Sequence, residues 1–190
     1  MTGLRDAVSD PAWFEAALDR VAEEPGAIAG LFPAVSRRCG RAPWSVGWTV
    51  DDAARVALLT ALPLRGKELV DEVSALYRYG DAAEKRGVLR ALDRLEVGDG
   101  CVELLRDAVR TNDPRLVAAA LGPYARHLDG AYWRQAVLKC VFMDIPLTVV
   151  HGLAQRADDE LRRMLAGLAE ERTAAGRTMP ADAVALLEAL

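Results

Sequence analysis

The stretch HLDGAYWRQAVLKCVFMDIPL, residues 127–147, decides the predicted fold. At 100° per residue its apolar side chains cover most of the circumference of a helix, which is typical of a helix that other helices bury. Arg134 lies within this apolar arc, between Leu138 and Val141. An unpaired buried charge is costly, so Arg134 needs a counter-charge. We expect an anionic ligand, a run of carbonyl oxygens, an acid of the same chain such as Asp81, Asp113 or Asp129, or a side chain that extends past the apolar arc to the surface.

Helix signals continue along the rest of the chain. The segments at residues 9–18 and 112–122 both begin with Asp-Pro, which places a cap before proline at the first helical position. Thr49 precedes Asp52 by three residues, as in a capping box. No segment alternates apolar and polar residues with period two, so we expect no sheet. The sequence therefore predicts an all-α protein.

The predicted helices are about 10–20 residues long with short connections, some amphipathic and some apolar all round, as in a two-layer helical array. GVLRAL at 87–92 and AVLKCV at 136–141 echo each other. This echo favours stacked helical hairpins of the HEAT or armadillo kind, with chance similarity as the alternative. We predict one helical domain over residues 1–190. Its buried core should include Val88, Leu89, Leu92, Val137, Leu138 and Cys140.

Composition narrows the class of protein. The chain has 190 residues, of which 52% are hydrophobic and 27% charged, which indicates a globular protein. A formal net charge of −4 argues against nucleic acid as a partner. The N-terminal residues lack the apolar core of a secretory signal, and no apolar run is long enough to span a membrane. Three separated cysteines fit reduced thiols, so we expect a cytoplasmic protein.

No constellation of catalytic residues is recognisable. His127 and His151 are the only histidines, and neither lies in a metal-binding motif, so we expect no metal and no cofactor. Asp51 and Asp52 are interpreted as acids that favour a helix N-terminus. Cys140 lies in an apolar helix, where burial should raise its pKa and lower its reactivity.

Binding features are stronger than catalytic ones. Aromatic and cationic groups at helix ends could line a groove for a small polar or anionic metabolite, with ordinary packing as the alternative. The candidate ligand-binding residues are Arg78, Tyr79, Tyr124, His127, Trp133, Arg134 and Lys139. Trp44 and Trp48 are interpreted as a lid over the next helix, and the stripe Arg86, Arg90 and Arg94 as a solvated face.

Several blocks of the chain resemble one family. LFPAVSRR, DDAARVALL, LYRYGDAAEKRGVLRAL and the long block from AVRTNDPRL to CVFMDIPL are similar to the EboA family of bacteria, over roughly residues 28–180. The resemblance implies an all-helical protein from a gene cluster for metabolite traffic that also encodes a UbiA-type membrane prenyltransferase. In cyanobacteria this family is associated with export of a scytonemin precursor. It supplies no catalytic residues to carry over.

Three functions remain open from the sequence. The first is a non-enzymatic binding or scaffold protein in the assembly or transport of a small secondary metabolite. The second is an enzyme, or an accessory subunit, that acts on a cyclitol- or prenyl-like intermediate with His127 as acid/base and Arg134 as anion clamp. The third is a pure interaction module for other pathway proteins, a membrane prenyltransferase among them.

Overall fold

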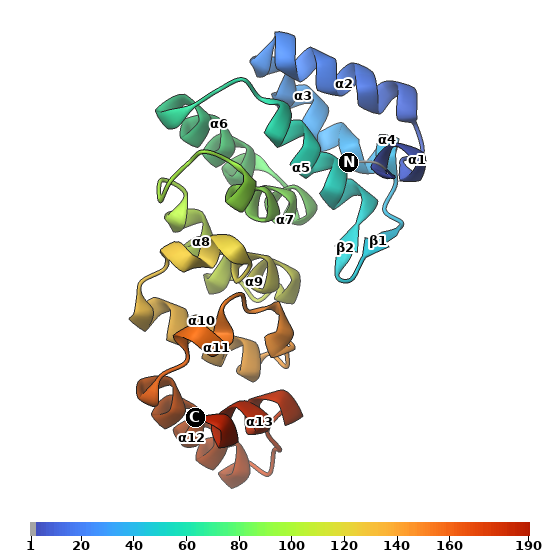
Figure 1. Ribbon diagram of the computed structural model, residues 1–190. Helices are drawn as coiled ribbons and strands as arrows, with labels where there is room; N and C mark the ends of the chain where they lie inside the picture. The colour runs from blue at the N-terminus through green and yellow to red at the C-terminus, as the bar shows by residue number, and fades with distance from the viewer. Residues whose placement is uncertain (1–2) are drawn as a thin grey trace. The chain divides into compact units, whose positions relative to one another are not determined.

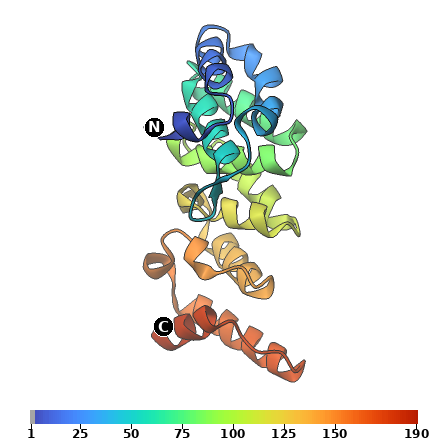
Figure 2. The same cartoon turned by 90° about the vertical axis from the view of Figure 1, so that its right-hand side faces the viewer.

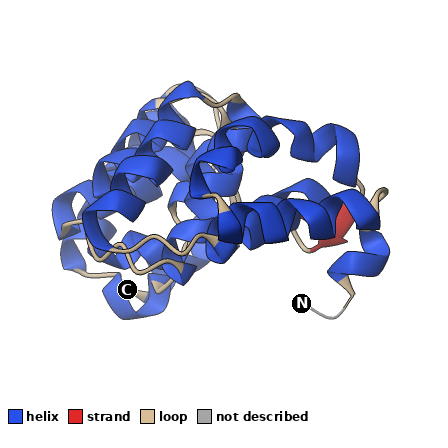
Figure 3. Cartoon of the chain, turned by 90° about the horizontal axis from the view of Figure 1, so that it is seen from above, coloured by secondary structure: helices blue, strands red, loops and turns tan. Residues whose placement is uncertain are grey.

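The computed structural model describes residues 3–190, and almost all of its regular structure is helix (Figure 3). The chain divides into two compact units, one up to Leu104 and one from Leu105 to Leu190. The division falls within α8 (Val102–Arg110). The predicted all-α class is confirmed. The stacked-hairpin arrangement and the single domain stay predictions.

The first unit is built around one helix, α5 (Val50–Ala61), which packs on α7 (Ala82–Ala91), α2 (Pro11–Glu23) and α4 (Val35–Cys39) (Figure 1). The helix α6 (Gly66–Tyr79) packs on α7. The shorter elements are α1 (Leu4–Ala7), α3 (Ile28–Leu31) and the 3-10 turns Pro25–Ala27, Phe32–Ala34 and Leu92–Arg94. Every residue from Ala54 to Leu59 is buried, so α5 forms the centre of this core.

A two-stranded hairpin precedes α5, which corrects the prediction of no sheet. The strands β1 (Pro43–Ser45) and β2 (Trp48–Thr49) pair antiparallel across the turn Val46–Gly47. Gly47 has a φ of 73°, a conformation that favours glycine. The strands are too short to produce a period-two pattern, so there was no alternation to detect in the sequence.

The second unit contains α9 (Pro114–Ala120), α10 (Gly130–Phe142), α11 (Leu153–Arg156), α12 (Asp159–Ala174) and α13 (Ala181–Ala189), with 3-10 turns at Pro123–His127 and Leu147–Val149. The helix α10 packs on α9 and α12, and α12 packs on α13 (Figure 2). The predicted Asp-Pro starts are confirmed, since Asp10 and Asp113 each accept a backbone N–H at the start of α2 and α9.

The helix α10 is not buried all round, contrary to the prediction from its apolar arc. Trp133, Val137 and Cys140 are buried, but Phe142 is 64% exposed and Leu138 is only half-buried. The other predicted core residues, Val88, Leu89 and Leu92, are buried as expected. Leu138 was wrongly placed in the core because the apolar pattern does not show how much of the circumference the neighbouring helices cover.

Candidate functional site

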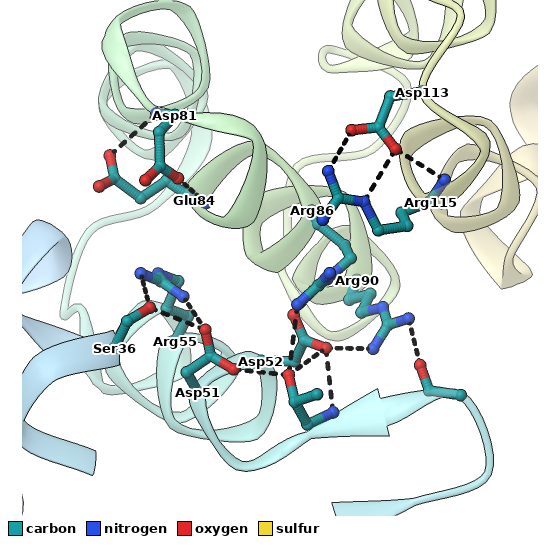
Figure 4. Close-up of polar contacts among 12 residues, drawn as sticks. Ser36, Asp51, Asp52, Arg55, Asp81, Glu84, Arg86, Arg90, Asp113 and Arg115 are labelled. Atoms are coloured by element: carbon teal, nitrogen blue, oxygen red, sulfur yellow. Dashed lines mark hydrogen bonds and ion pairs between the residues drawn. The ribbon is translucent and has the colours of Figure 1, made fainter. Parts of the chain in front are cut away.

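A cluster of buried charges lies at the start of α5, and Asp51 is its first member (Figure 4). Its carboxylate accepts hydrogen bonds from the Ser36 hydroxyl at 2.8 Å and from Arg55 Nη1 at 2.9 Å. The Thr49 hydroxyl lies 2.5 Å from its other oxygen. Burial raises the pKa of Asp51, but the hydrogen bonds from Thr49, Ser36 and Arg55 and the charge of Arg55 outweigh it and lower the pKa.

Asp52 is the second carboxylate of this cluster, and its side chain is 1% exposed. Arg86 Nε donates to Oδ1 at 2.7 Å, and Arg90 Nη1 donates to Oδ2 at 2.5 Å. The Thr49 backbone N–H donates to Oδ2 at 3.1 Å, which confirms the predicted capping box. The buried ionic cluster thus consists of Asp51, Asp52, Arg55, Arg86 and Arg90.

The cluster corrects two interpretations of the sequence. Asp51 and Asp52 do more than cap a helix, since they bind three guanidinium groups, one of them buried and two largely so. Arg86 and Arg90 do not form a solvated face, because their side chains are only 12% and 14% exposed. Burial lowers the pKa of Arg90, the charge of Asp52 opposes this, and Arg86 lowers the pKa further. The cluster joins α5 to α7 by charge as well as by packing.

Arg90 also fixes the hairpin. Its Nη2 donates to the Gly47 carbonyl at 2.6 Å, and its guanidinium lies 4.6 Å from the centre of the Trp48 ring. A cation over an indole face is attracted to the ring's negative π-surface. Because Asp52 holds Arg90 from the other end, Trp48 is held against a fixed group.

A pocket of about 330 Å³ opens between the hairpin and α5. The predicted lid residues Trp44 and Trp48 form one of its walls. The facing side of α5 contributes small side chains, which leave the space open. The lining residues are Leu4, Trp44, Ser45, Trp48, Ala53, Val56, Ala57, Thr60 and Arg94. This volume lies at the lower end of the range for small-molecule sites, about 300–1,000 Å³.

Arg94 differs from the other arginines of this region. It is exposed, and no carboxylate of the described residues forms an ion pair with it. The guanidinium carbon of Arg94 lies 6.0 Å from the centre of the Trp48 ring. A second pocket of about 160 Å³ shares Thr60 and Arg94 with the first, so the two pockets adjoin at this arginine. The spacing in the sequence had placed Arg94 in a solvated stripe, and neither pocket was predicted.

The seven predicted ligand-binding residues are divided between the units. Arg78 and Tyr79 end α6 in the first unit, where both are exposed, Tyr79 to 82%. The other five belong to the second unit. Ligand binding by these residues stays a prediction.

In the second unit most of the predicted residues contact other side chains of the fold. The Tyr124 ring is buried and its centre lies 4.8 Å from that of His127. Trp133 is buried beneath Arg156, whose guanidinium carbon lies 4.6 Å from the ring centre. Arg156 donates to the carbonyls of Ala125 and Leu128, a structural role that the sequence did not indicate. Lys139 is half-buried on α10.

Arg134 has a partner in the same chain, although not one of the acids expected from the sequence. Its Nη1 lies 2.8 Å from Asp158 Oδ2, and the two side chains are 21% and 47% exposed. Asp158 also caps α12 by accepting the Leu161 N–H at 2.9 Å. The long arginine side chain therefore reaches from the apolar arc to the surface, instead of placing a charge inside the helical layers.

Arg134→Met is therefore expected to lower the free energy of unfolding by less than about 1 kcal/mol, the usual value of an exposed ion pair. Chemical denaturation followed by circular dichroism measures this. Arg163→Met is the matched control, because Arg163 forms an exposed pair with Glu160 on α12. A loss of about 3 kcal/mol or more at Arg134 alone would mean that its charge is buried in solution.

Metal-binding groups do not gather in the described part of the chain. No group of three or more His, Cys, Asp or Glu side chains among residues 3–190 could hold a metal ion. The three cysteines, all within the described residues, are buried and form no disulfide bond. Burial raises the pKa of Cys39 and Cys101 to about 11 and that of Cys140 to about 12. The low reactivity predicted for Cys140 follows from this pKa.

We expect Ellman's reagent at pH 8 to label no thiol of the native protein and all three after unfolding. Because burial disfavours the thiolate form, the buried thiols are compatible with the fold only while they are protonated. Their contribution to stability is present below the ordinary thiol pKa of about 9.0 and is lost as pH rises towards 11–12. Cys140→Ala, which leaves two thiols, is the control for the count. Labelling of the native protein at the rate of free cysteine would contradict the burial.

The described residues thus form a helical protein with a pocket of about 330 Å³ beside a largely buried ionic cluster. The family model of EboA, "Metabolite traffic protein EboA", matches residues 33–188. The chain belongs to the EboA family, as its sequence blocks indicated. Comparison with the curated proteins and with the solved structures gives no match. No helix of the described residues is long and apolar enough to cross a membrane.

Proposed function

We propose that this protein is a non-enzymatic binding protein that holds a small metabolite in the pocket between the hairpin and α5. The family supports a role in metabolite handling. The observation that carries the proposal is the pocket itself, with two tryptophans on one wall and small side chains on the other. Its lining combines aromatic and small apolar side chains with the polar groups of Ser45, Thr60 and Arg94, and small-molecule sites commonly place a few polar groups in this way.

The chemistry of the pocket favours binding over catalysis. Its lining contains no histidine, carboxylate or cysteine that could act as a base or nucleophile. The Thr60 hydroxyl donates to the carbonyls of Val56 and Ala57 within its own helix. The partners that we propose are a small secondary metabolite and cytoplasmic proteins of the same pathway, with a membrane prenyltransferase among the candidates.

Native mass spectrometry of the protein purified from its own host tests this proposal. We expect a population whose mass exceeds that of the chain by one small molecule, and we expect Ala53→Leu to lose it, because the longer side chain fills the pocket. Steady turnover of a pathway intermediate by the purified protein would overturn the non-enzymatic function. An empty chain bound tightly to another protein would favour an interaction module instead.

A further inference from the structure

The pocket lining contains one charged side chain, Arg94, which can favour a ligand of opposite charge. Most of its lining is apolar or aromatic, from Leu4 and the two tryptophans to Ala53, Val56 and Ala57. Arg94 is the charged side chain in this lining. An unpaired guanidinium beside an apolar space offers planar hydrogen-bond donors to a carboxylate or a similar anion.

The neighbouring arginines, unlike Arg94, are already paired with carboxylates. The guanidinium groups of Arg55, Arg86 and Arg90 are held by Asp51 and Asp52. Arg65, which lines the adjoining smaller pocket with Arg94, forms an ion pair with Glu96. Arg94 is thus the guanidinium of the pocket lining that is available to an anionic group.

The opposite wall is fixed before a ligand arrives. Arg90 holds the Trp48 ring and the Gly47 carbonyl, and Asp52 holds Arg90. Arg94 lies near the same indole ring. A flat apolar body against Trp48 therefore has the Arg94 guanidinium within reach of a charged substituent. A fixed wall reduces the entropy that a ligand must lose to order its site.

From these observations we infer that the pocket takes an organic anion with a flat apolar body, in which the body packs between the two tryptophans and α5 and the anionic group binds Arg94. This inference rests on the function proposed above, and it adds the ligand class. Arg94 determines the preference for an anionic ligand. The small side chains of Ala53 and Ala57 leave room for the ring system of that ligand.

Three probes with one ring system and different head groups test the ligand class. They are 2-naphthoate, 2-naphthalenemethanol and 2-naphthylmethylammonium, titrated into the full chain by calorimetry. We expect the anion to bind about tenfold more tightly than the alcohol, as a charged hydrogen bond allows, and the cation to bind most weakly. Arg94→Gln should remove the tenfold preference and leave the affinity for the alcohol unchanged.

Arg65→Gln is the matched control, because Glu96 already neutralises Arg65, and it should leave all three affinities unchanged. Ala53→Leu should abolish binding of anion and alcohol alike, and Thr60→Leu on the exposed side of α5 is a second pocket-filling variant if Ala53→Leu fails to fold. An anion preference that survives Arg94→Gln would overturn the inference, and so would equal affinity for the three probes.

The failures of the two proposals are distinguishable. If the filling variants weaken binding but Arg94→Gln does not, the pocket binds small molecules and only the ligand class is wrong. If the filling variants leave all binding unchanged, this pocket is not the site, and both proposals fail.

Discussion

Asp52→Asn is expected to lower the free energy of unfolding by about 3–5 kcal/mol, the cost of breaking a buried ion pair by removing one partner. Asparagine has nearly the same shape and can still accept the Thr49 N–H, so the helix cap survives. The charge is lost, however, and with it the carboxylate that Arg86 and Arg90 both contact. Their side chains are only 12% and 14% exposed, so water replaces this carboxylate only in part.

Urea denaturation followed by circular dichroism measures this loss. Asp81→Asn is the matched control, because Asp81 caps α7 by accepting the Glu84 N–H at 2.8 Å and is exposed. Asparagine caps a helix about as well as aspartate, so this control should change stability by less than about 0.5 kcal/mol. A loss below about 1 kcal/mol for Asp52→Asn would mean that water reaches the ionic cluster in solution.

Loss of the Asp52 carboxylate should also weaken ligand binding in the pocket. Without the carboxylate, Arg90 is no longer fixed, and the Trp48 ring loses the group that holds it in the pocket wall. We therefore expect a variant that still folds to bind the naphthoate probe more weakly, although Asp52 does not line the pocket. The cluster and the pocket are in this way parts of one arrangement.

Local signals in the sequence predicted the helices well. Helix starts depend on residues within one turn, and the caps at Asp10, Thr49 and Asp113 were all readable from short patterns. The family was also identifiable, because its blocks lie along most of the chain. Helix caps and family blocks can be identified without knowing which helices pack against each other.

The ionic cluster could not be predicted in this way. Arg86 and Arg90 lie 34 and 38 positions from Asp52, and a stripe of arginines at helical spacing has the same pattern whether it faces water or acids. Gly87 between them was the one available signal, since glycine within a helix often marks a close approach. The pocket depends on a short hairpin and a distant arginine, which no periodicity brings together.

For Arg134 the sequence led to a different error, since its charge was expected inside the helical layers. The sequence indicated that Arg134 needs a counter-charge, and Asp158 supplies it. The error was the depth of the charge, because an arginine can keep its stem on an apolar face while its guanidinium reaches the surface. Angular position on a helix predicts where the Cβ atom points, but not where a long side chain ends.

Gly87→Ala is expected to destabilise the protein, although alanine in a helix is ordinarily the better residue by about 1 kcal/mol. A Cβ atom at Gly87 would lie 2.7 Å from Cδ and 2.9 Å from Cβ of Arg55. Arg55 cannot move aside easily, because Asp51 and Ser36 hold its guanidinium and its side chain is 1% exposed. Because Arg55 is held in place, we expect an overpacking cost near the upper end of the usual range of about 1–3 kcal/mol. After the helix gain of about 1 kcal/mol, this leaves a net loss of up to about 2 kcal/mol.

Gly167→Ala in α12 is the control for helix propensity alone, because an added Cβ there meets nothing within 4 Å. It should raise the free energy of unfolding by about 0.5–1 kcal/mol. Opposite signs for the two substitutions in denaturant titrations would support the close approach of α5 and α7. Equal stabilisation by both would contradict it. The ionic cluster would then lack the tight helix pair that excludes water from it, and the loss predicted for Asp52→Asn should shrink as well.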